Sequence, residues 1–585
     1  MRFHGIHKAG GIAVDRPGQV CGLARGLRAG LAGGLLALAL AGCTTKQYSQ
    51  QADNDAYKVI AQKQDVAFGT TQPFTINYTP FPAGAADDKP MLNGQPIPMG
   101  DQPQRVLSLD ECLELACRNS RPFASRKEIL YIAALNLANA RHQWSLFSGP
   151  LTANANTAAT GDGGANHSAG GHTGLSFAQQ FANGGAASLG AGMNLASDLL
   201  GMNSSSLGSA LSASFTQPLL QGAWRGLAYE SLYRQERDLA FAVLDYQRFT
   251  QTFSVTVATR YYQVLQQLDE LENERASIKR LEQTLALTRA LVQGGQRPRL
   301  EQDQAEQNLL NAQVRFTSDT QRYQDSLDNY KLTLGLPIQA TIALDAQELQ
   351  ALNERGPAPL AVEESQAVEM AFHARPDVLT QRASLRDAER NVEIAADKFI
   401  PGVDLLLNSG VPSTPQRDAL NLQFGQHTRG MGLGLNYPLD QTNNRDAYRR
   451  AQISQSQTQR AYTEFLDRVR LDVRQAYRQL VQAKESYDLQ LRSLTVAQRR
   501  RKLANEERKA GLASARDVLD AEDALREAQN GVTAALVTYE TTRINFLTTL
   551  GLIDVDENGK IHERNEPFRF DRLEGRYSGA GQQPS

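Results

Sequence analysis

The sequence predicts a mainly α-helical fold with a β portion, organised as an internal two-fold repeat. Three observations predict it. Two stretches, 225–293 and 444–509, contain no proline and are far longer than an ordinary globular helix. The chain repeats its own pattern at an offset of 216 positions. A third stretch, 149–217, has only two charged residues and alternates apolar with small polar residues.

The repeat relates the two halves of the chain residue by residue. The matching segments are Val257–Val264 with Val473–Leu480, Gly295 with Gly511, Leu309 with Leu525, and Thr333–Leu336 with Thr549–Leu552. A unit of this length is far longer than the repeats of solenoid proteins. The sequence therefore indicates a two-copy architecture.

The long stretches are predicted to form antiparallel coiled-coil helices. At 1.5 Å per residue each is a rod of roughly 100 Å. Val257, Tyr261 and Val264 are spaced by four and three residues, and Val473 and Tyr477 repeat that register. This spacing favours a heptad seam over one-sided packing in an ordinary bundle.

Two shorter helices are expected in the first copy, over 108–147 and 299–334. Their summed length is close to that of the long helix 225–293. Stacked end to end beside the long helix, they would form the wall of an α-barrel tunnel.

Composition and motifs argue against several classes of protein. Lys and Arg number 61 against 63 Asp and Glu, so there is no basic surplus of the kind that nucleic-acid binders carry. No stretch after residue 43 has 18 consecutive uncharged apolar residues. The sequence has no P-loop, nucleophile elbow or zinc-protease histidine pair. We therefore expect no enzyme activity, no cofactor and no metal site.

The N-terminus has the pattern of an export signal. Arg25 and Arg28 precede a short apolar stretch that ends in Leu-Ala-Gly-Cys at Cys43. This ending resembles a bacterial lipobox, which implies cleavage before Cys43 and its lipidation; the alternative is an ordinary signal peptide with a chance cysteine. Thr44, where an aspartate would favour the inner membrane, makes the outer membrane the expected location.

The alternating segments predict strands that face lipid. The six candidate strands are 151–160, 173–182, 186–196, 206–216, 402–409 and 430–437. Alternation of apolar and small polar residues is typical of outer-membrane strands; the alternatives are a flexible linker or edge strands of a soluble sheet. A closed membrane barrel needs at least eight strands, and an open edge in lipid is not viable. The strands therefore predict a shared, oligomeric outer-membrane β-barrel.

Three motifs together resemble the TolC family of outer-membrane efflux and secretion channels. They are the Gly-Leu-Ala-Ser-Ala-Arg-Asp-Val-Leu-Asp-Ala run 511–521, the Gln-Pro-Leu-Leu run 217–220, and the Ser-Leu-Asp-Glu-Cys-Leu-Glu-Leu-Ala run 108–116. The resemblance implies a homotrimer with a 12-stranded barrel, four strands per protomer. It also implies a helical tunnel that docks with a periplasmic adaptor (membrane fusion) protein and an inner-membrane RND or ABC transporter. The six candidate strands exceed four, so either a hairpin is added or 173–196 is an external loop.

The resemblance places a periplasmic gate at the hairpin tips, with constriction residues Asp517, Asp520 and Glu301. Asp517 and Asp520 are three residues apart and share one helix face. Around a three-fold axis they would form rings of carboxylates that select cations. The alternative is an ordinary solvated acidic face.

The tip turns are the expected contact with the adaptor. They contain Gly294, Gly295, Gly511, Leu512, Ala513 and Ser514. The glycines are expected to supply the positive φ of tight turns. Ala513 stands where some family members have a bracing arginine, which leaves Arg516 or Arg299 as the expected brace.

The expected function is a trimeric outer-membrane channel of a tripartite efflux or type I secretion system. The alternative is a lipid-anchored periplasmic coiled-coil scaffold without a channel. The expected organisation is a signal peptide (1–42), an N-terminal extended arm (43–105), the first repeat (106–337), a connector (338–360), the second repeat (361–553) and a polar C-terminal tail (554–585).

Overall fold

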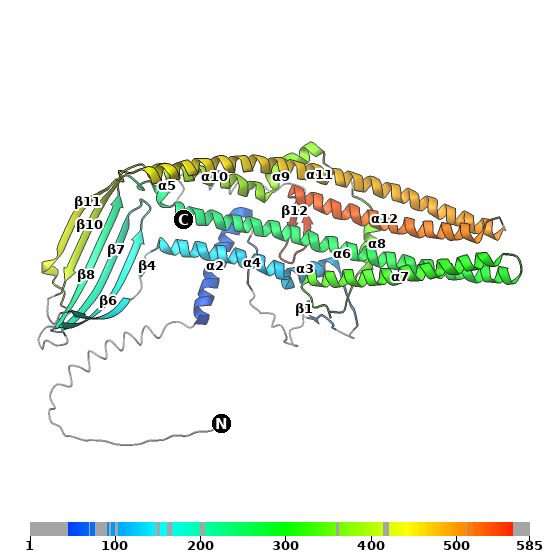
Figure 1. Cartoon of the computed structure of the whole chain (residues 1–585), viewed down its shortest axis with the longest axis horizontal. Helices are drawn as coiled ribbons and strands as arrows, with labels where there is room; N and C mark the ends of the chain where they lie inside the picture. The colour runs from blue at the N-terminus through cyan, green and yellow to red at the C-terminus, as the bar shows by residue number, and fades with distance from the viewer. Residues whose placement is uncertain are drawn as a thin grey trace, which may run out of the picture. The chain divides into compact units, whose positions relative to one another are not determined.

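The structure is a computed structural model of the whole chain (Figure 1). It describes residues 45–68, 71–76, 91–92, 95–99, 103–145, 147–148, 152–160, 166–198, 205–358, 362–413, 421–510 and 512–564. The chain divides into two compact units, Met1–Asp55 and Ala56–Ser585. All contacts reported below lie within the second unit.

The helices and strands follow the predicted repeat. The helices are α2 (Thr45–Phe68), α3 (Leu109–Asn119), α4 (Arg121–Gln143), α5 (Arg225–Ala228), α6 (Glu230–Gln293), α7 (Arg299–Leu334), α8 (Ala346–Arg355), α9 (Glu364–Ala374), α10 (Pro376–Asp397), α11 (Thr442–Lys509) and α12 (Ala515–Leu550). The strands are β1 (Met91–Leu92), β2 (Gln95–Pro96), β3 (Arg105–Leu107), β4 (Phe147–Ser148), β5 (Thr152–Thr160), β6 (Asn166–Gln180), β7 (Ala186–Asp198), β8 (Ser205–Pro218), β9 (Ile342–Leu344), β10 (Gly402–Pro412), β11 (Thr428–Asn436), β12 (Ile553–Val555) and β13 (Ile561–Glu563).

Four helices form a row in the half of the molecule away from the large sheet (Figure 1). The α6–α7 hairpin and the α11–α12 hairpin lie side by side, with α12 packed on α6. Their order is therefore α7, α6, α12, α11. Nearer the sheet, α4 packs on α6 and α10 packs on α11, so that α4 and α10 take the places of α7 and α12. The predicted stacking of shorter helices end to end beside the long helix of the first copy is confirmed, and the second copy has the same arrangement.

The predicted helix over 108–147 is wrong in one respect, because the structure breaks it at Ser120. Ser120 ends α3 with extended backbone (φ −70°, ψ 127°), and Pro122 occupies the first turn of α4. Proline lacks an N–H and restricts the residue before it, so it is tolerated in a first turn but not inside a helix. The start of α3 is set by a capping box between Ser108 and Glu111.

Two glycines at equivalent positions of the repeat allow the ends of neighbouring helices to pack closely. Gly335 ends α7 with φ 73°, and Gly551 ends α12 with φ 75°. A Cβ added at Gly335 would lie 2.2 Å from the carbonyl oxygen of Asn119, at the end of α3. At Gly551 it would lie 2.8 Å from the carbonyl oxygen of Ala374, at the end of α9. The backbone at the end of α7 therefore packs directly on the end of α3, and the backbone at the end of α12 packs on the end of α9.

The predicted apolar seam is buried in both long helices. Val257, Tyr261 and Val264 are at most 1% exposed, and Val473 is fully buried. Farther along α11 the spacing of four and three residues would continue the seam to Leu491, but the side chain of Leu491 is exposed. None of the helices in the described part of the chain combines the length and the apolarity that a membrane span requires.

All six predicted strands belong to one antiparallel sheet. Its order is β11-β10-β8-β7-β6-β4, with β5 also pairing β6. The pairs Ser148↔Phe177 and Thr152↔Gly174 show that β4 and β5 follow one another along the same edge of β6. The sheet therefore has six strand positions, and the idea that 173–196 is a loop outside the sheet is wrong. The turn between β6 and β7 is tight, with Gly184 at φ 78°.

The two faces of the sheet differ in composition. Paired residues such as Phe177↔Leu189 and Leu407↔Met431 put the odd-numbered residues of β5, β6, β7, β8, β10 and β11 on one face. That face carries Leu175, Phe177, Leu189, Met193, Leu211, Phe215, Leu405, Leu407, Met431, Leu433 and Leu435. The even-numbered face carries mainly Gly, Ser and Asn, with Leu406 as an exception.

Both predicted terminal segments are partly wrong. The expected extended arm contains α2, because Ala56, Val59 and Ile60 have helical spacing and pack with Leu130 and Leu239. The expected polar tail begins with the β12–β13 hairpin, where Lys560 bonds Asp110 across 2.7 Å. The signal peptide and residues 565–585 lie outside the described residues.

Candidate functional site: the hairpin tips

The two hairpin tips are joined by one arginine. Arg297, in the turn between α6 and α7, donates from Nη2 to the carbonyl oxygen of Ala513 at 3.3 Å. Its Nη1 lies 3.4 Å from Oε1 of Glu301, one turn farther along the chain. Glu301 thus holds the bridging guanidinium in place. The bond between the two tips within one chain is thus made by Arg297, whereas Arg516 lies near Asp520 on its own helix.

Ser514 and Asp517 form a capping box at the start of α12. Ser514 donates from N and from Oγ to Oδ2 of Asp517, at 2.8 and 2.7 Å, and Asp517 N donates to Ser514 Oγ at 3.3 Å. These bonds satisfy backbone groups that a helix start leaves unpaired. They also lower the pKa of the Asp517 carboxyl below its usual value, so this residue keeps its charge to lower pH than an ordinary aspartate.

The three predicted constriction carboxylates therefore have different surroundings. Asp517 is engaged in the cap, and Asp520 is exposed, with Arg516 Nε 3.9 Å away on the same helix. Glu301 is only 15% exposed and belongs to the bridge. Asp517 and Asp520 both lie in the first two turns of α12, where their spacing of three residues puts them on one face.

The turn residues differ from the prediction in one glycine. Gly295 has φ 70°, whereas Gly294 has φ −76° and needs no glycine for its conformation. Leu512 is 83% exposed beside the buried Ala513, which makes it the apolar end of the second tip. Gly511 and Cys43 lie outside the described residues.

Behind the tips, a polar seam joins the two hairpins, and the sequence analysis did not find it. The contacts across the seam are Arg508–Thr288 (2.6 Å), Arg280–Glu522 (2.5 Å), Glu274–Arg526 (3.3 Å), Asn273–Asn530 (3.0 Å) and Asp269–Thr533 (2.7 Å). The only signal in the sequence is the spacing of 522, 526, 530 and 533, which puts polar side chains on one face of α12.

Glu274 is the most buried charge of this seam. Its side chain is 1% exposed, and Arg315 on α7 lies 3.2 Å from Oε1. Arg526 on α12 approaches Oε2. One carboxylate from α6 therefore pairs with guanidinium groups from both neighbouring helices, and it holds three helices together.

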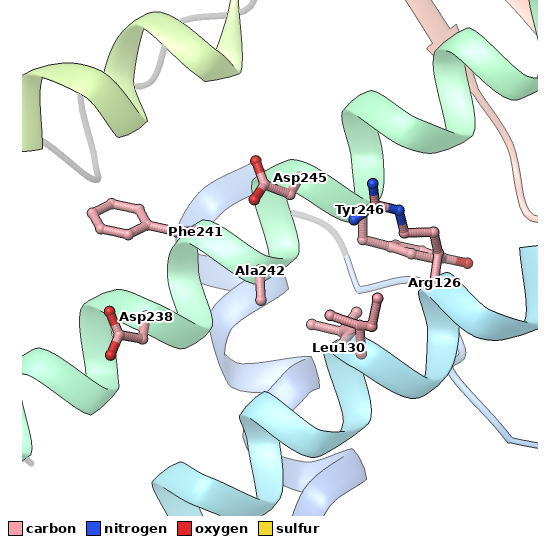
Figure 2. Close-up of a pocket in the computed structure, with 8 residues that line it drawn as sticks. Arg126, Leu130, Asp238, Phe241, Ala242, Asp245 and Tyr246 are labelled. Carbon is pink, nitrogen blue, oxygen red and sulfur yellow. The ribbon is translucent and has the colours of Figure 1, made fainter. Parts of the chain in front are cut away.

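A small cavity of about 170 Å³ lies between α4 and α6 (Figure 2). Arg126 and Leu130 reach it from α4, and Asp238 and Asp245 from α6. Burial raises the pKa of both carboxyls. Within the described residues, no group of three or more His, Cys, Asp or Glu side chains is placed to hold a metal ion. We assign no ligand to this cavity.

Comparison with known proteins gives one match to a family model, over part of the chain, and one fold. Residues 367–552 match the family model described as outer membrane efflux protein. The open-state MtrE outer membrane channel of Neisseria gonorrhoeae has a TM-score of 0.57 at 16% identity, over 79% of this chain and 96% of that one. The CmeC outer membrane channel of Campylobacter jejuni has a TM-score of 0.56 at 14% identity, over 80% of this chain and 88% of that one. The outer membrane protein VceC of Vibrio cholerae has a TM-score of 0.57 at 15% identity, over 76% of this chain and 96% of that one.

At these identities the likeness establishes the fold, and it confirms the predicted class, mainly α with a β portion. The sequence matches none of the curated proteins.

Proposed function

We propose that the chain forms a trimeric outer-membrane channel. The premise is the match of residues 367–552 to the family model of outer membrane efflux proteins, which confirms the resemblance predicted from the motifs. In this proposal the chain serves a tripartite efflux or type I secretion system. The sheet forms a barrel shared between copies, and the helices form a tunnel into the periplasm. The hairpin tips dock with an adaptor protein, and an inner-membrane RND or ABC transporter supplies the energy.

The observation that carries this proposal is the sheet with one apolar face and two unpaired edges. A row of large apolar side chains on one face is what lipid requires of a strand, whereas Gly, Ser and Asn suit a water-filled interior. Within the described residues, β11 and β5 have neighbours on one side only. Unpaired backbone groups cannot be left in lipid, so other copies must complete the sheet.

The outer helices of the row support the same conclusion. On α11 a stripe of exposed residues has alternating spacings of four and three residues; it comprises Leu471, Gln475, Arg478, Gln482, Glu485, Leu489, Arg492, Val496, Arg499 and Leu503. On α7, at the opposite end of the row, the matching stripe comprises Leu300, Asp303, Gln307, Leu310, Val314, Thr317, Gln321 and Gln324. Both have the spacing of a coiled-coil seam. If the α11 stripe of one copy packed on the α7 stripe of the next, arginines of α11 would lie near Asp303 of α7. The helices of the copies would then form a closed ring.

The anchoring of the protein tests the channel against the scaffold alternative. We expect Cys43→Ser to leave most of the protein in the outer membrane, because the barrel would anchor it without the lipid. The measurement is the fraction of protein in outer-membrane and periplasmic fractions after cell fractionation. Quantitative release into the periplasm would favour the lipid-anchored scaffold and end the channel proposal.

The gate is tested by ion selectivity. We expect Asp517→Asn with Asp520→Asn to lower the preference for cations, because rings of carboxylates attract cations and amides do not. Asparagine is chosen over alanine because the side-chain oxygen of asparagine at 517 can still accept the hydrogen bond from Ser514 N. The measurement is the reversal potential under a salt gradient in planar bilayers.

Asp488→Asn is the matched control for this test, since Asp488 is an exposed carboxylate of α11 away from the tip. It should leave the reversal potential unchanged. If the double variant is as selective as the wild type, Asp517 and Asp520 do not line the constriction. If the wild type carries no current, the channel proposal itself fails.

A further inference from the structure

We propose that each copy of the chain contributes six strands to the shared barrel, and that β11 of one copy pairs with β5 of the next. This inference rests on the proposed function, because it assumes that copies close a barrel in the outer membrane. In a trimer the wall would have three times six, or eighteen, strands. The resemblance in sequence implied four strands per copy.

The strands that exceed four are an integral part of the sheet. β6 and β7 pair continuously from Ser168↔Asp198 to Gln180↔Ala186, and β7 pairs with β8 along its length. Leu189 and Phe177 lie opposite one another on the same apolar face as Leu405 and Leu433. The two additional strands therefore have the lipid-facing pattern of the others.

The turn between β6 and β7 is anchored at the helical end of the sheet. Gln217 donates to the carbonyl oxygen of Asn183 at 2.9 Å, and Asn183 accepts the backbone N–H of Gly185 at 3.1 Å. A Cβ at Gly184 would lie 2.6 Å from the carbonyl oxygen of Gly222. Phe181 packs edge-on against Phe215, with ring centroids 6.0 Å apart. These contacts fix the hairpin beside β8.

The two free edges fit each other. β5 and β11 are each nine residues long, about the length of a membrane-spanning strand. β5 follows α4 and runs away from the helices, whereas β11 returns toward α11. Paired between copies they would be antiparallel, as every other pair in this sheet is. The occupant that satisfies both edges is a second copy of the chain.

The widths of the sheet and of the helix row also agree. Six strands about 4.8 Å apart, tilted by about 40°, occupy an arc of roughly 38 Å. Four helices at interaxial distances of about 9–10 Å occupy roughly 36–40 Å. Four strands would occupy only roughly 25 Å at the same spacing and tilt. With six strands, the sheet of one copy is therefore about as wide as its row of four helices.

The proposal is tested by a charge on the lipid-facing side of the additional hairpin. We expect Leu189→Arg to reduce the amount of heat-modifiable trimer in the outer membrane roughly tenfold, as charges on the lipid face of such barrels do. Leu433→Arg on β11 is the positive control, and Ser188→Arg, on the opposite face of β7, should assemble close to the wild-type level. A Leu189→Arg variant that assembles normally while Leu433→Arg does not would place the hairpin outside the wall and overturn the proposal.

A strand count separates this inference from the proposed function. Cryo-electron microscopy of the trimer in lipid nanodiscs should show eighteen strands. Twelve strands with β6 and β7 outside the wall would overturn the six-strand inference and leave the channel intact. A protein without a shared barrel, or normal assembly of Leu433→Arg, would overturn the proposed function itself.

Discussion

Replacing Glu274 with alanine is expected to lower the free energy of unfolding by about 3 kcal/mol, the lower end of the range for a buried ion pair that loses one partner. The carboxylate is 1% exposed, whereas Arg315 and Arg526 retain 36% and 20% exposure. The two guanidinium groups would lose their shared counter-charge but would keep part of their hydration. The measurement is the apparent melting temperature by far-ultraviolet circular dichroism, at one scan rate, in detergent.

The matched control for this variant is Glu306→Ala. Glu306 is 49% exposed, and its nearest cation, Arg289, lies 3.9 Å away. Exposed pairs of this kind contribute about 0–1 kcal/mol. We therefore expect the control to melt close to the wild type. Equal melting temperatures for both variants would show that the cluster around Glu274 does not hold the hairpins together.

Replacing Gly335 with alanine is expected to cost about 3 kcal/mol or more, from two additive causes. A non-glycine residue at positive φ costs about 1–3 kcal/mol, and overpacking costs about another 1–3 kcal/mol. Gly335 has φ 73°, and the added Cβ would lie 2.2 Å from the carbonyl oxygen of Asn119. The Cβ is fixed by the backbone of residue 335 and the oxygen belongs to the backbone of Asn119, so neither atom can move without shifting packed backbone. The junction between α3 and α7 should therefore open.

Gly295 and Gly551 separate the two causes. At Gly295, with φ 70°, an added Cβ meets nothing within 4 Å, so alanine there should cost only about 1 kcal/mol. At Gly551 the closest approach is 2.8 Å, to the carbonyl oxygen of Ala374. The loss in melting temperature should therefore rank Gly335→Ala above Gly551→Ala, and Gly551→Ala above Gly295→Ala. Equal losses at Gly335 and Gly295 would mean that close packing adds nothing at this junction.

The elements that sequence reasoning found are those with a long, regular pattern. Heptad spacing around Val257 and Tyr261 predicted α6 before any contact was known, and the same spacing in the second copy predicted α11. Alternation predicted six strands, and all six belong to the sheet. The break at Ser120 does not follow from the helical pattern of 108–147, because a proline in the first turn of a helix leaves the pattern on both sides unchanged. The helix α2 was missed because its apolar face is short and its other residues are polar.

The candidate site was predicted only in part. Family motifs located the two tips, and the spacing of Asp517 and Asp520 predicted that they share one helix face. The bridge from Arg297 to Ala513 joins residues 216 positions apart, and its acceptor is a backbone carbonyl. Such a bond leaves no pattern in either side chain. The partners of Glu274 likewise come from two other helices, α7 and α12.

Local patterns in the sequence determined which segments are long helices and which are strands, and the match between the two copies of these patterns showed the internal repeat. They are local because helix and strand periodicities bring neighbouring residues to one face. Only the tertiary structure decided the order of the strands, the integration of 173–196 into the sheet, and the pairing of Glu274 with Arg315 and Arg526. Those features depend on which faces meet across hundreds of residues, and that is settled by packing and by pairing of buried polar groups, not by spacing along the chain.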